Sequence, residues 1–482
     1  MKVAPILFRL EPNASGKTAN VREDLEPEGV KRLPAHEKSV GVSPLAAGVL
    51  RRNDLKTWTK PAPSLYPHQW SWDSAFIALG LAHMDNRRAA RELETLFASQ
   101  WDTGKLPHII FNPEAPPKSY FPDAERWNSA TLSSDAPSEP HTSGLCQPPI
   151  HAIAVLRIWE AARGKDERRV ELARSFLRDS YPRLLAWHLY LATARDPEGS
   201  GLVTIYHPWE SGTDNSPRWD AALEAFEVGD LPPYTRRDLD HVTEPSQRPS
   251  DEEYDRYLWL LELLKRACYE EAEIYESHPF LIKDVLFSAI LVAANEALLR
   301  IAAAIDAPED ERAFIEHWME RGRKSLDEHW DPDLKLCLDY DLRAEKPARV
   351  RTIAGFAPLI SGGLSPERLK DLLETLDSPA FAGNPDLRRP LPPSTSPEDS
   401  GFHPRSYWRG PVWPVMNWLL WWSLLRAGEH ERAEEMRRAT LDGLADSGFA
   451  EYFEPFTGEA LGASDQSWTA AVALDLLAAA DG

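Results

Sequence analysis

The segment HPWESGTDNSPRWD, residues 207–220, combines acidic side chains with tryptophans in a stretch rich in turn-forming residues. Apolar rings beside a carboxyl group raise its pKa by desolvation, which keeps the group protonated and able to act as an acid. The faces of Trp209 and Trp219 also suit stacking on sugar rings. The alternative interpretation is a hydrogen-bonded structural turn in which Asp214 caps a short helix, and composition alone weighs the two interpretations equally.

A second acidic segment, GFAEYFEPFTGE at residues 448–459, lies far from the first in the sequence. Glu451 has aromatic neighbours, whereas Glu459 is expected to be exposed. Hydrolysis of a glycosidic bond needs two opposed carboxyl groups, one that protonates the leaving oxygen and one that activates water. Asp214 and Glu451 are therefore a candidate pair, and the alternative for this segment is an ordinary loop with solvated acids.

Two further segments are rich in tryptophan. In YPHQWSWDSAF, residues 66–76, Asp73 stands where a helix begins, so it is a candidate helix cap as well as a candidate acceptor for sugar hydroxyls. In SYWRGPVWP, residues 406–414, the indoles are suited either to wall a pocket or to pack in the interior.

Hydrophobic residues recur at helical spacing through most of the chain, as at Tyr257, Leu261, Leu264 and Cys268. Alternating strand patterns are rare and short, so we predict an all-α fold, which at this length is a solenoid, a bundle or a closed ring of helix pairs. Ser365 and Pro366 give a helix start signal. The predicted helices span 73–99, 148–163, 166–195, 251–275, 280–304, 308–328, 365–377, 411–426, 430–446 and 466–480.

Long polar and aromatic stretches separate these helices, at 100–147, 201–250, 379–410 and 447–465. Long loops are usually functional, and their recurrence after helices suggests that they gather at one end of a ring. The charged stretches 228–253 and 386–400 are interpreted either as flaps over a site or as plain surface loops. Residues 1–45 are predicted to form an extended N-terminal leader.

The composition restricts the partners of this 482-residue chain. Its formal net charge of -22 argues against nucleic acid and membrane surfaces as partners, and an anionic substrate would need a locally basic pocket. The three cysteines suggest neither a disulfide framework nor a zinc site. The apolar run before Arg9 is too short for a signal peptide, and no later run is predicted to span a bilayer. We therefore expect a cytoplasmic protein.

Four segments in this order resemble glycoside hydrolase family 63: WSWD at 70–73, ESGTDNS at 210–216, YWRG at 407–410 and EYFEP at 451–455. Within that family, the size and the aromatic loops are most similar to bacterial mannosylglycerate and glucosylglycerate hydrolases. The resemblance implies an (α/α)6 barrel over residues 46–482, with loop insertions at about 100–147, 201–250 and 379–410. It also implies an inverting enzyme without cofactor or metal.

The resemblance assigns roles to individual residues. Asp214 would be the general acid and Glu451 the general base. The family's contacts to the sugar fall on Tyr66, Trp70, Trp72, Asp73, Tyr407, Trp408, Trp413 and Gln466, and its contacts to the glycerate fall on Tyr120, Gln147, Arg248 and Tyr254. The sequence departs from the family at Glu454, where asparagine is expected, and we expect this second acid to affect the base.

We therefore predict hydrolysis of α-linked mannosylglycerate, glucosylglycerate or both, to a free hexose and glycerate. The alternatives are a trehalase-like hydrolase of other short α-glucosides, a sugar epimerase on a similar helical ring, and a sugar-binding protein without catalysis. Scattered histidines argue against an epimerase, and the joint presence of Asp214 and Glu451 argues against simple binding. The choice between mannose and glucose, and self-association into a homo-oligomer, are left open by the sequence.

Overall fold

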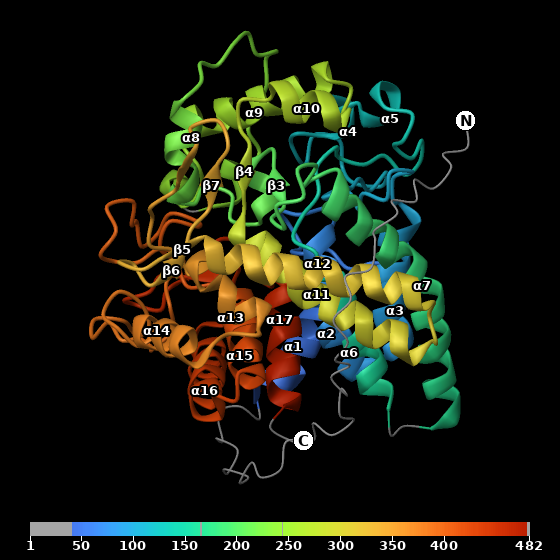
Figure 1. The fold of residues 1–482 in the computed structure, drawn as a ribbon, viewed down its shortest axis with the longest axis vertical. Helices are drawn as coiled ribbons and strands as arrows, with labels where there is room; N and C mark the ends of the chain where they lie inside the picture. The colour runs from blue at the N-terminus through green and yellow to red at the C-terminus, as the bar shows by residue number, and fades with distance from the viewer. Residues whose placement is uncertain (1–40, 164–165, 243, 480–482) are drawn as a thin grey trace, which may run out of the picture. The chain divides into compact units, whose positions relative to one another are not determined.

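The computed structural model describes residues 41–163, 166–242 and 244–479, all of which belong to a unit that begins at residue 36. Helices dominate this unit, as the periodicity predicted (Figure 1). Residues 1–40 of the predicted leader lie outside the described residues. Residues 42–45 already belong to the first helix, α1 (Val42–Asn53), which packs on the last helix of the chain.

Six mostly buried helices contact one another in a series that returns to its start. In chain order each contacts the next, and the last contacts the first. These inner helices are apolar around most of their circumference, as expected for helices covered on every side. They are α2 (Ser71–Met84), α6 (His151–Ala162), α11 (Val285–Ala304), α13 (Ala357–Ser361), α15 (Pro414–Arg426) and α17 (Ser467–Ala478).

Amphipathic helices lie outside this series, and each packs a narrow apolar face on an inner partner. α1 packs on α17, α3 on α2, α7 on α6, α12 on α11 and α16 on α15. In α12, for example, Ile315 and Leu326 are buried while most other residues are charged. The outer helices that follow α1 are α3 (Asn86–Ala98), α7 (Glu167–Thr193), α12 (Glu309–Glu328) and α16 (His430–Ser447), and α14 (Pro366–Leu376) follows α13.

The predicted helices agree with the observed ones except at two breaks and at one helix that begins later than predicted. The helix predicted over 73–99 is two helices, because the side chain of Asp85 caps α3 by accepting a hydrogen bond from the backbone N–H of Arg87. The helix predicted over 251–275 is divided into α9 (Asp251–Arg266) and α10 (Glu271–Ser277) by Cys268 and Tyr269, which have positive φ angles. The helix predicted over 280–304 begins late, since residues 282–283 form a strand. The cap predicted at Ser365 is confirmed.

Short antiparallel strands fasten the long loops. β1 (Gln69–Trp70) pairs with β2 (Ile109–Ile110), and β9 (Tyr452–Phe453) pairs with β10 (Ala460–Leu461). The order β3–β4–β7–β8 makes a four-stranded sheet of Thr204–Ile205, Ile282–Lys283, Tyr340–Asp341 and Lys346–Pro347. β5 (Trp330–Asp331) pairs with β6 (Leu336–Cys337). β1 directly precedes α2, and β9 directly follows Glu451, so the strands fix two of the motif segments.

The loops also contain short helical turns. Figure 1 shows α4, α5, α8, α9 and α10 together above the long paired helices, so several loops do gather on one side. The additional helices are α4 (Ala124–Trp127), α5 (Ser129–Leu132) and α8 (Asp220–Glu224). The 3-10 turns are η2 (Pro208–Ser211), η3 (Pro217–Trp219), η4 (Asp238–His241), η5 (Pro245–Gln247) and η6 (Ile353–Phe356).

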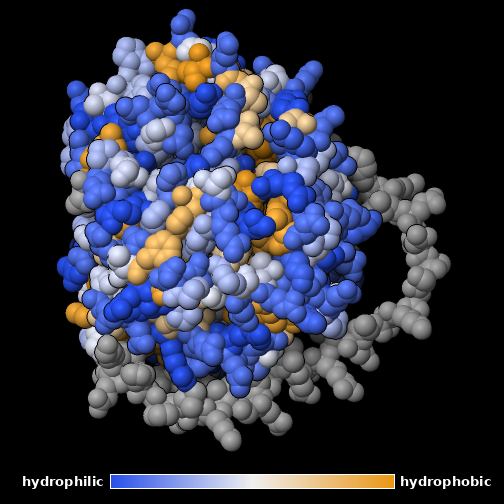
Figure 2. Space-filling view, turned by 90° about the vertical axis from the view of Figure 1, so that its left-hand side faces the viewer, coloured by the Kyte–Doolittle hydropathy of each residue, from blue (hydrophilic) through white to orange (hydrophobic). Residues whose placement is uncertain are grey.

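Helix α11 corrects one expectation. Within the described part of the chain it is the helix long and apolar enough to cross a bilayer, although no such run was predicted. An 18-residue window of this helix is 83% buried. The helix contacts α6, α7, α12 and α13, so its apolar surface is covered by protein. The face of the molecule in Figure 2 is largely hydrophilic, with small separate hydrophobic patches. The apolar character of α11 is therefore that of a core helix.

Candidate active site

One cavity is lined by residues from all four motif segments. Of the fourteen residues predicted for the site, all except Trp413 line this cavity. Those thirteen are Tyr66, Trp70, Trp72, Asp73, Tyr120, Gln147, Asp214, Arg248, Tyr254, Tyr407, Trp408, Glu451 and Gln466.

Asp214 lies on the tight loop between η2 and η3. Burial is the main cause that raises the pKa of its carboxyl group to about 7; the charge of Arg248 opposes the shift and that of Glu451 adds to it. The loop is held at two successive residues: the Asp214 carbonyl accepts from the Tyr257 hydroxyl at 3.1 Å, and Asn215 Oδ1 accepts from the N–H of Trp408 at 2.8 Å. A carboxyl group with this pKa is about half protonated near neutral pH and can donate a proton.

A glycine makes the loop around Asp214 possible. Gly212 has φ +71°, and a Cβ placed on it would lie 2.5 Å from the ring of Trp72. Any other residue would clash with this ring, which itself lines the cavity. The close approach of the loop to Trp72 therefore depends on Gly212.

Glu451 is 1% exposed and lies at the start of the β9–β10 hairpin. Its Oε1 accepts from the Tyr66 hydroxyl at 2.6 Å. Its Oε2 accepts from Arg248 Nη2 at 3.0 Å and from the backbone N–H of Ala463 at 2.9 Å. Three donors from three separate segments thus fix the orientation of this carboxylate toward the cavity.

Asp73 is a third carboxyl group of the cavity. It lies in the first turn of α2, but among the described residues no side chain caps that helix, so the predicted capping role of Asp73 is not observed. Burial raises its pKa well above the usual range, and the charges of Glu451 and Asp214 add to the shift. The three acids therefore influence one another electrostatically within one site.

Aromatic rings form the walls. Trp70 packs edge-on against Tyr66 and Tyr120, with ring centroids 5.1 and 5.2 Å apart. Trp413 lies behind Trp408 instead of lining the cavity: the two indoles are parallel, with centroids 3.7 Å apart. Trp413 thus supports the wall from the second layer, and its Nε1 donates to the carbonyl of Tyr407 at 3.2 Å.

The residues expected at the glycerate end all line the cavity, and two of them use their polar groups within the protein. Tyr254 donates its hydroxyl to the carbonyl of Phe121 at 3.1 Å, and Gln147 Oε1 accepts from the N–H of Trp72 at 3.3 Å. Arg248 spans Glu451 and the Tyr66 hydroxyl, which lies 3.1 Å from Nη1. Its buried Nε has no hydrogen-bond partner in the part of the chain that the structure describes.

Several lining residues were not predicted. Arg237 and Asp238 come from the charged loop 228–253, where one arginine among several carries no distinguishing signal. Trp209 stands inside a motif that was singled out, and Trp468 follows Gln466 at the start of α17, so both were within reach of the sequence. The remaining unpredicted lining residues are Leu65, His108, Ser119, Phe121, Gly212 and Pro249.

Glu454 does not line the cavity that Glu451 lines. Its carboxylate accepts from the backbone N–H groups of Phe456 and Thr457 and from the hydroxyl of Thr457, and so closes the turn of the β9–β10 hairpin. It lines a separate small cavity together with Asn417. The acid that departs from the family pattern therefore has a local structural role.

Comparisons with known proteins identify the family. Residues 66–469 match the model of the mannosylglycerate hydrolase MGH1-like glycoside hydrolase domain. The chain is 48% identical over 432 residues to the glucosylglycerate hydrolase of Mycolicibacterium hassiacum, covering 90% of this chain and 96% of that protein. It is 41% identical over 430 residues to the mannosylglycerate hydrolase of Thermus thermophilus, covering 89% and 99%.

The fold of a solved relative agrees with these matches. The crystal structure of the family 63 mannosylglycerate hydrolase from Thermus thermophilus in complex with Tris and D-glycerate superposes with a TM-score of 0.83 at 40% identity. The superposition covers 90% of this chain and 99% of that one. The chain therefore belongs to glycoside hydrolase family 63, as one of its mannosylglycerate hydrolase MGH1-like members.

Proposed function

We propose that this protein is an inverting hydrolase of α-linked glycosylglycerates, with Asp214 as general acid and Glu451 as general base. The observation that carries the proposal is the pairing, in one aromatic cavity, of a carboxyl group with pKa near 7 and a carboxylate held by three donors. The helical unit is an (α/α)6 barrel in this proposal, supported by the series of six inner helices that returns to its start.

The chemistry follows from the two acids. Asp214 gives its proton to the glycosidic oxygen as the bond from the anomeric carbon to that oxygen breaks. Glu451 takes a proton from a water molecule whose oxygen attacks the same carbon from the opposite face. Room for this water needs carboxyl groups roughly 6.5–9.5 Å apart. An α-linked substrate then releases its sugar first as the β-anomer.

Recognition of the substrate divides between the two ends of the cavity. Trp70, Trp72 and Trp408 offer apolar faces to the hexose, and Asp73 and Gln466 offer polar groups to its hydroxyls. Arg248 supplies the cation that a glycerate carboxylate requires in a protein of net charge -22. The names of the similar hydrolases and the glycerate bound to one of them support this substrate class.

A cytoplasmic location is part of the proposal. Cys146, Cys268 and Cys337 are all free thiols, and two of them are buried, as is usual in a reducing compartment.

The proposal is tested by offering α-glucosylglycerate and α-mannosylglycerate together and measuring the release of glycerate. The wild-type protein should cleave one or both, and Asp214→Asn and Glu451→Gln should each lower kcat by at least about 1,000-fold while still unfolding cooperatively on heating. Cleavage of other α-glucosides without release of glycerate would contradict the substrate class. Near-normal activity of Asp214→Asn would contradict the assignment of the acid.

A further inference from the structure

The motif that carries Asp214 contains a second carboxylate, Glu210, which does not line the cavity. Glu210 is 0% exposed, and its ion-pair partner Arg195, just after α7, is 1% exposed. The two side chains form a bidentate pair, with distances of 2.7 and 2.8 Å from the guanidinium nitrogens to the carboxylate oxygens. Burying two charges is costly, so a buried pair outside the reacting site needs a structural or functional account.

Glu210 joins two segments that line the cavity. Its Oε1 accepts from the backbone N–H of Cys146 at 3.2 Å, and Gln147, the next residue, faces the cavity. Its Oε2 accepts from the backbone N–H of Tyr206 at 2.7 Å. Tyr206 directly precedes the segment 207–220 that carries Asp214, which we call the acid loop. One carboxylate thus ties the loop of the acid to the loop of Gln147.

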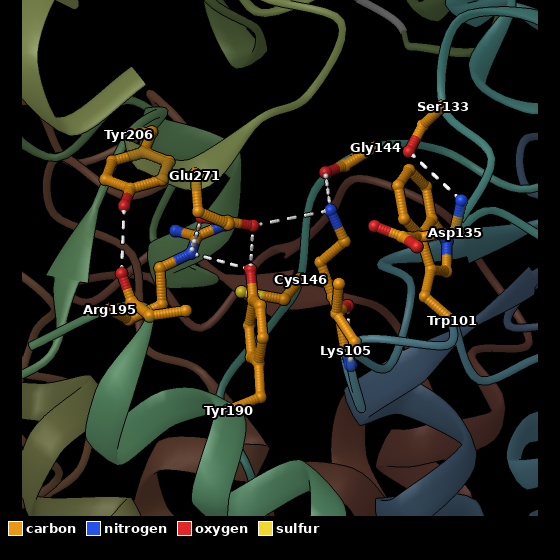
Figure 3. A network of polar contacts seen from close by, with 12 residues as sticks. Trp101, Lys105, Ser133, Asp135, Gly144, Cys146, Tyr190, Arg195, Tyr206 and Glu271 are labelled. Atoms are coloured by element: carbon orange, nitrogen blue, oxygen red, sulfur yellow. Dashed lines mark hydrogen bonds and ion pairs between the residues drawn. The ribbon is translucent and has the colours of Figure 1, made fainter. Parts of the chain in front are cut away.

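A buried network holds this pair in place. Figure 3 shows Arg195, Tyr190, Glu271 and Lys105 directed toward one another. Arg195 Nε lies 2.8 Å from the Tyr190 hydroxyl and 3.0 Å from Glu271 Oε2, and its guanidinium stacks on the ring of Tyr206. Lys105 Nζ lies 3.6 Å from Glu271 Oε1 and donates to the carbonyl of Gly144 at 3.0 Å.

The charges in the network balance. Two cations, Lys105 and Arg195, face two carboxylates, Glu210 and Glu271. Arg195 holds the pKa of Glu210 below its usual range despite complete burial. The network therefore keeps the Glu210 carboxylate charged where it accepts hydrogen bonds from the loop of Gln147 and from the segment before Asp214, a position that we call the branch point. Glu210 itself is buried and does not line the cavity.

We propose that Glu210, held by Arg195, is a positioning residue for the proton transfer from Asp214: it sets the place of the acid relative to the aglycone side of the cavity. The inference rests on the proposed function. Displacement of a catalytic group by about 1 Å can cost about 100-fold in rate, which is the size of effect expected from loosening this branch point.

The test compares two substrates of different leaving group. The glycerate of a glycosylglycerate needs a proton to depart, whereas the fluoride of an α-glycosyl fluoride leaves with little help from an acid. Glu210→Gln should lower kcat at least about 100-fold on the glycosylglycerate and less than about tenfold on the fluoride. The matched control, Glu271→Gln, makes the same change in the same network but contacts neither loop backbone, and should lower both rates less than about fivefold.

Two further variants complete the test. Arg195→Lys keeps the charge but loses the bidentate geometry, and should reproduce the substrate-dependent loss in weaker form if Glu210→Gln fails to fold. Equal losses on both substrates, in Glu210→Gln or in Arg195→Lys, would overturn the inference. Asp214→Asn run in parallel separates this outcome from failure of the proposed function, because an active Asp214→Asn would refute the acid itself.

Discussion

Arg248 Nη2 lies 3.0 Å from Glu451 Oε2, across 203 residues of sequence, and both groups are buried at the cavity wall. The arginine expected to hold the carboxylate of the substrate is thus also a partner of the expected base. The same guanidinium opposes the raised pKa of Asp214. One cation therefore acts on both carboxyl groups that we propose for catalysis.

Replacement of Arg248 by glutamine is expected to lower kcat/KM for a glycosylglycerate by about 10- to 100-fold, since a hydrogen bond to a charged group contributes about 1.5–3 kcal/mol. The residual activity should extend to higher pH, because loss of the positive charge raises the pKa of Asp214. Arg405→Gln is the control: Arg405 pairs with Glu244 and Glu459 at the surface and does not line the cavity. An unchanged pH profile in Arg248→Gln would show that its charge does not act on the acid.

The pH dependence of kcat/KM should report Asp214. Its pKa of about 7 means that the active, protonated form predominates below that pH and is lost above it. We expect a fall of activity on the alkaline side with a midpoint near 7, measured with the wild-type enzyme on a glycosylglycerate. A rate that stays constant up to pH 9 would contradict the role of Asp214 as acid.

The same carboxyl group should make a measurable difference to stability. The pKa of Asp214 rises from near 4 in the unfolded chain to about 7 on folding. Its ionisation therefore lowers the free energy of unfolding progressively between these two pH values, and this loss of stability is complete above about pH 7. Asp214→Asn should therefore melt at a higher temperature than wild type at pH 8, and the difference should shrink toward pH 4. Equal melting temperatures at pH 8 would indicate that the buried, ionised carboxylate of Asp214 does not destabilise the folded protein.

Gly212→Ala should damage activity more than stability. The substitution costs about 1–2 kcal/mol for the positive φ, and the added methyl group would push the acid loop away from Trp72. Gly428→Ala is a matched control, because Gly428 has φ +81° and open space around its Cβ position. Both variants should lose stability in denaturant titrations, Gly212→Ala the more because of its contact with Trp72, and only Gly212→Ala should lose kcat, by at least about tenfold. Equal activities would show that the loop tolerates displacement.

Glu454→Asn, which restores the residue expected for the family, should leave the activity and its pH profile nearly unchanged. The carboxylate of Glu454 closes the hairpin turn and lines a different cavity from Glu451. We expect a loss of about 1 kcal/mol in the free energy of unfolding, because an amide offers fewer acceptor positions to the turn. A shifted acidic limb in the pH–rate profile would show that Glu454 does act on the base.

Much of the helical framework was predictable because amphipathic periodicity is a local signal. The predicted range 166–195 corresponds to α7 and 430–446 to α16. The breaks at Asp85 and at Cys268–Tyr269 were missed, since one capping side chain or two non-glycine residues with positive φ leave little trace in composition. The return of the inner series from α17 to α2 joins the two ends of the chain, and no local pattern contains that information.

The site was predictable as far as its motifs reached. The motif segments predicted both acids and most of the aromatic residues that line the cavity. Whether a given indole lines the cavity or lies behind another depends on packing, so Trp413 was expected to line the cavity although it lies behind Trp408. The contact between Arg248 and Glu451 required the three-dimensional arrangement of two distant loops. The role inferred for Glu210 was hidden for the same reason, because its partners Arg195 and Cys146 come from two distant segments.

The configuration of the sugar at the moment of its release distinguishes inversion from retention. Proton NMR of a concentrated enzyme sample with α-glucosylglycerate or α-mannosylglycerate, recorded before mutarotation, distinguishes the two anomers of the first product. A single displacement by water between Asp214 and Glu451 requires the β-anomer first, followed by slow appearance of the α-anomer. Initial release of the α-anomer would contradict it, because retention needs a covalent intermediate and carboxyl groups only about 5 Å apart.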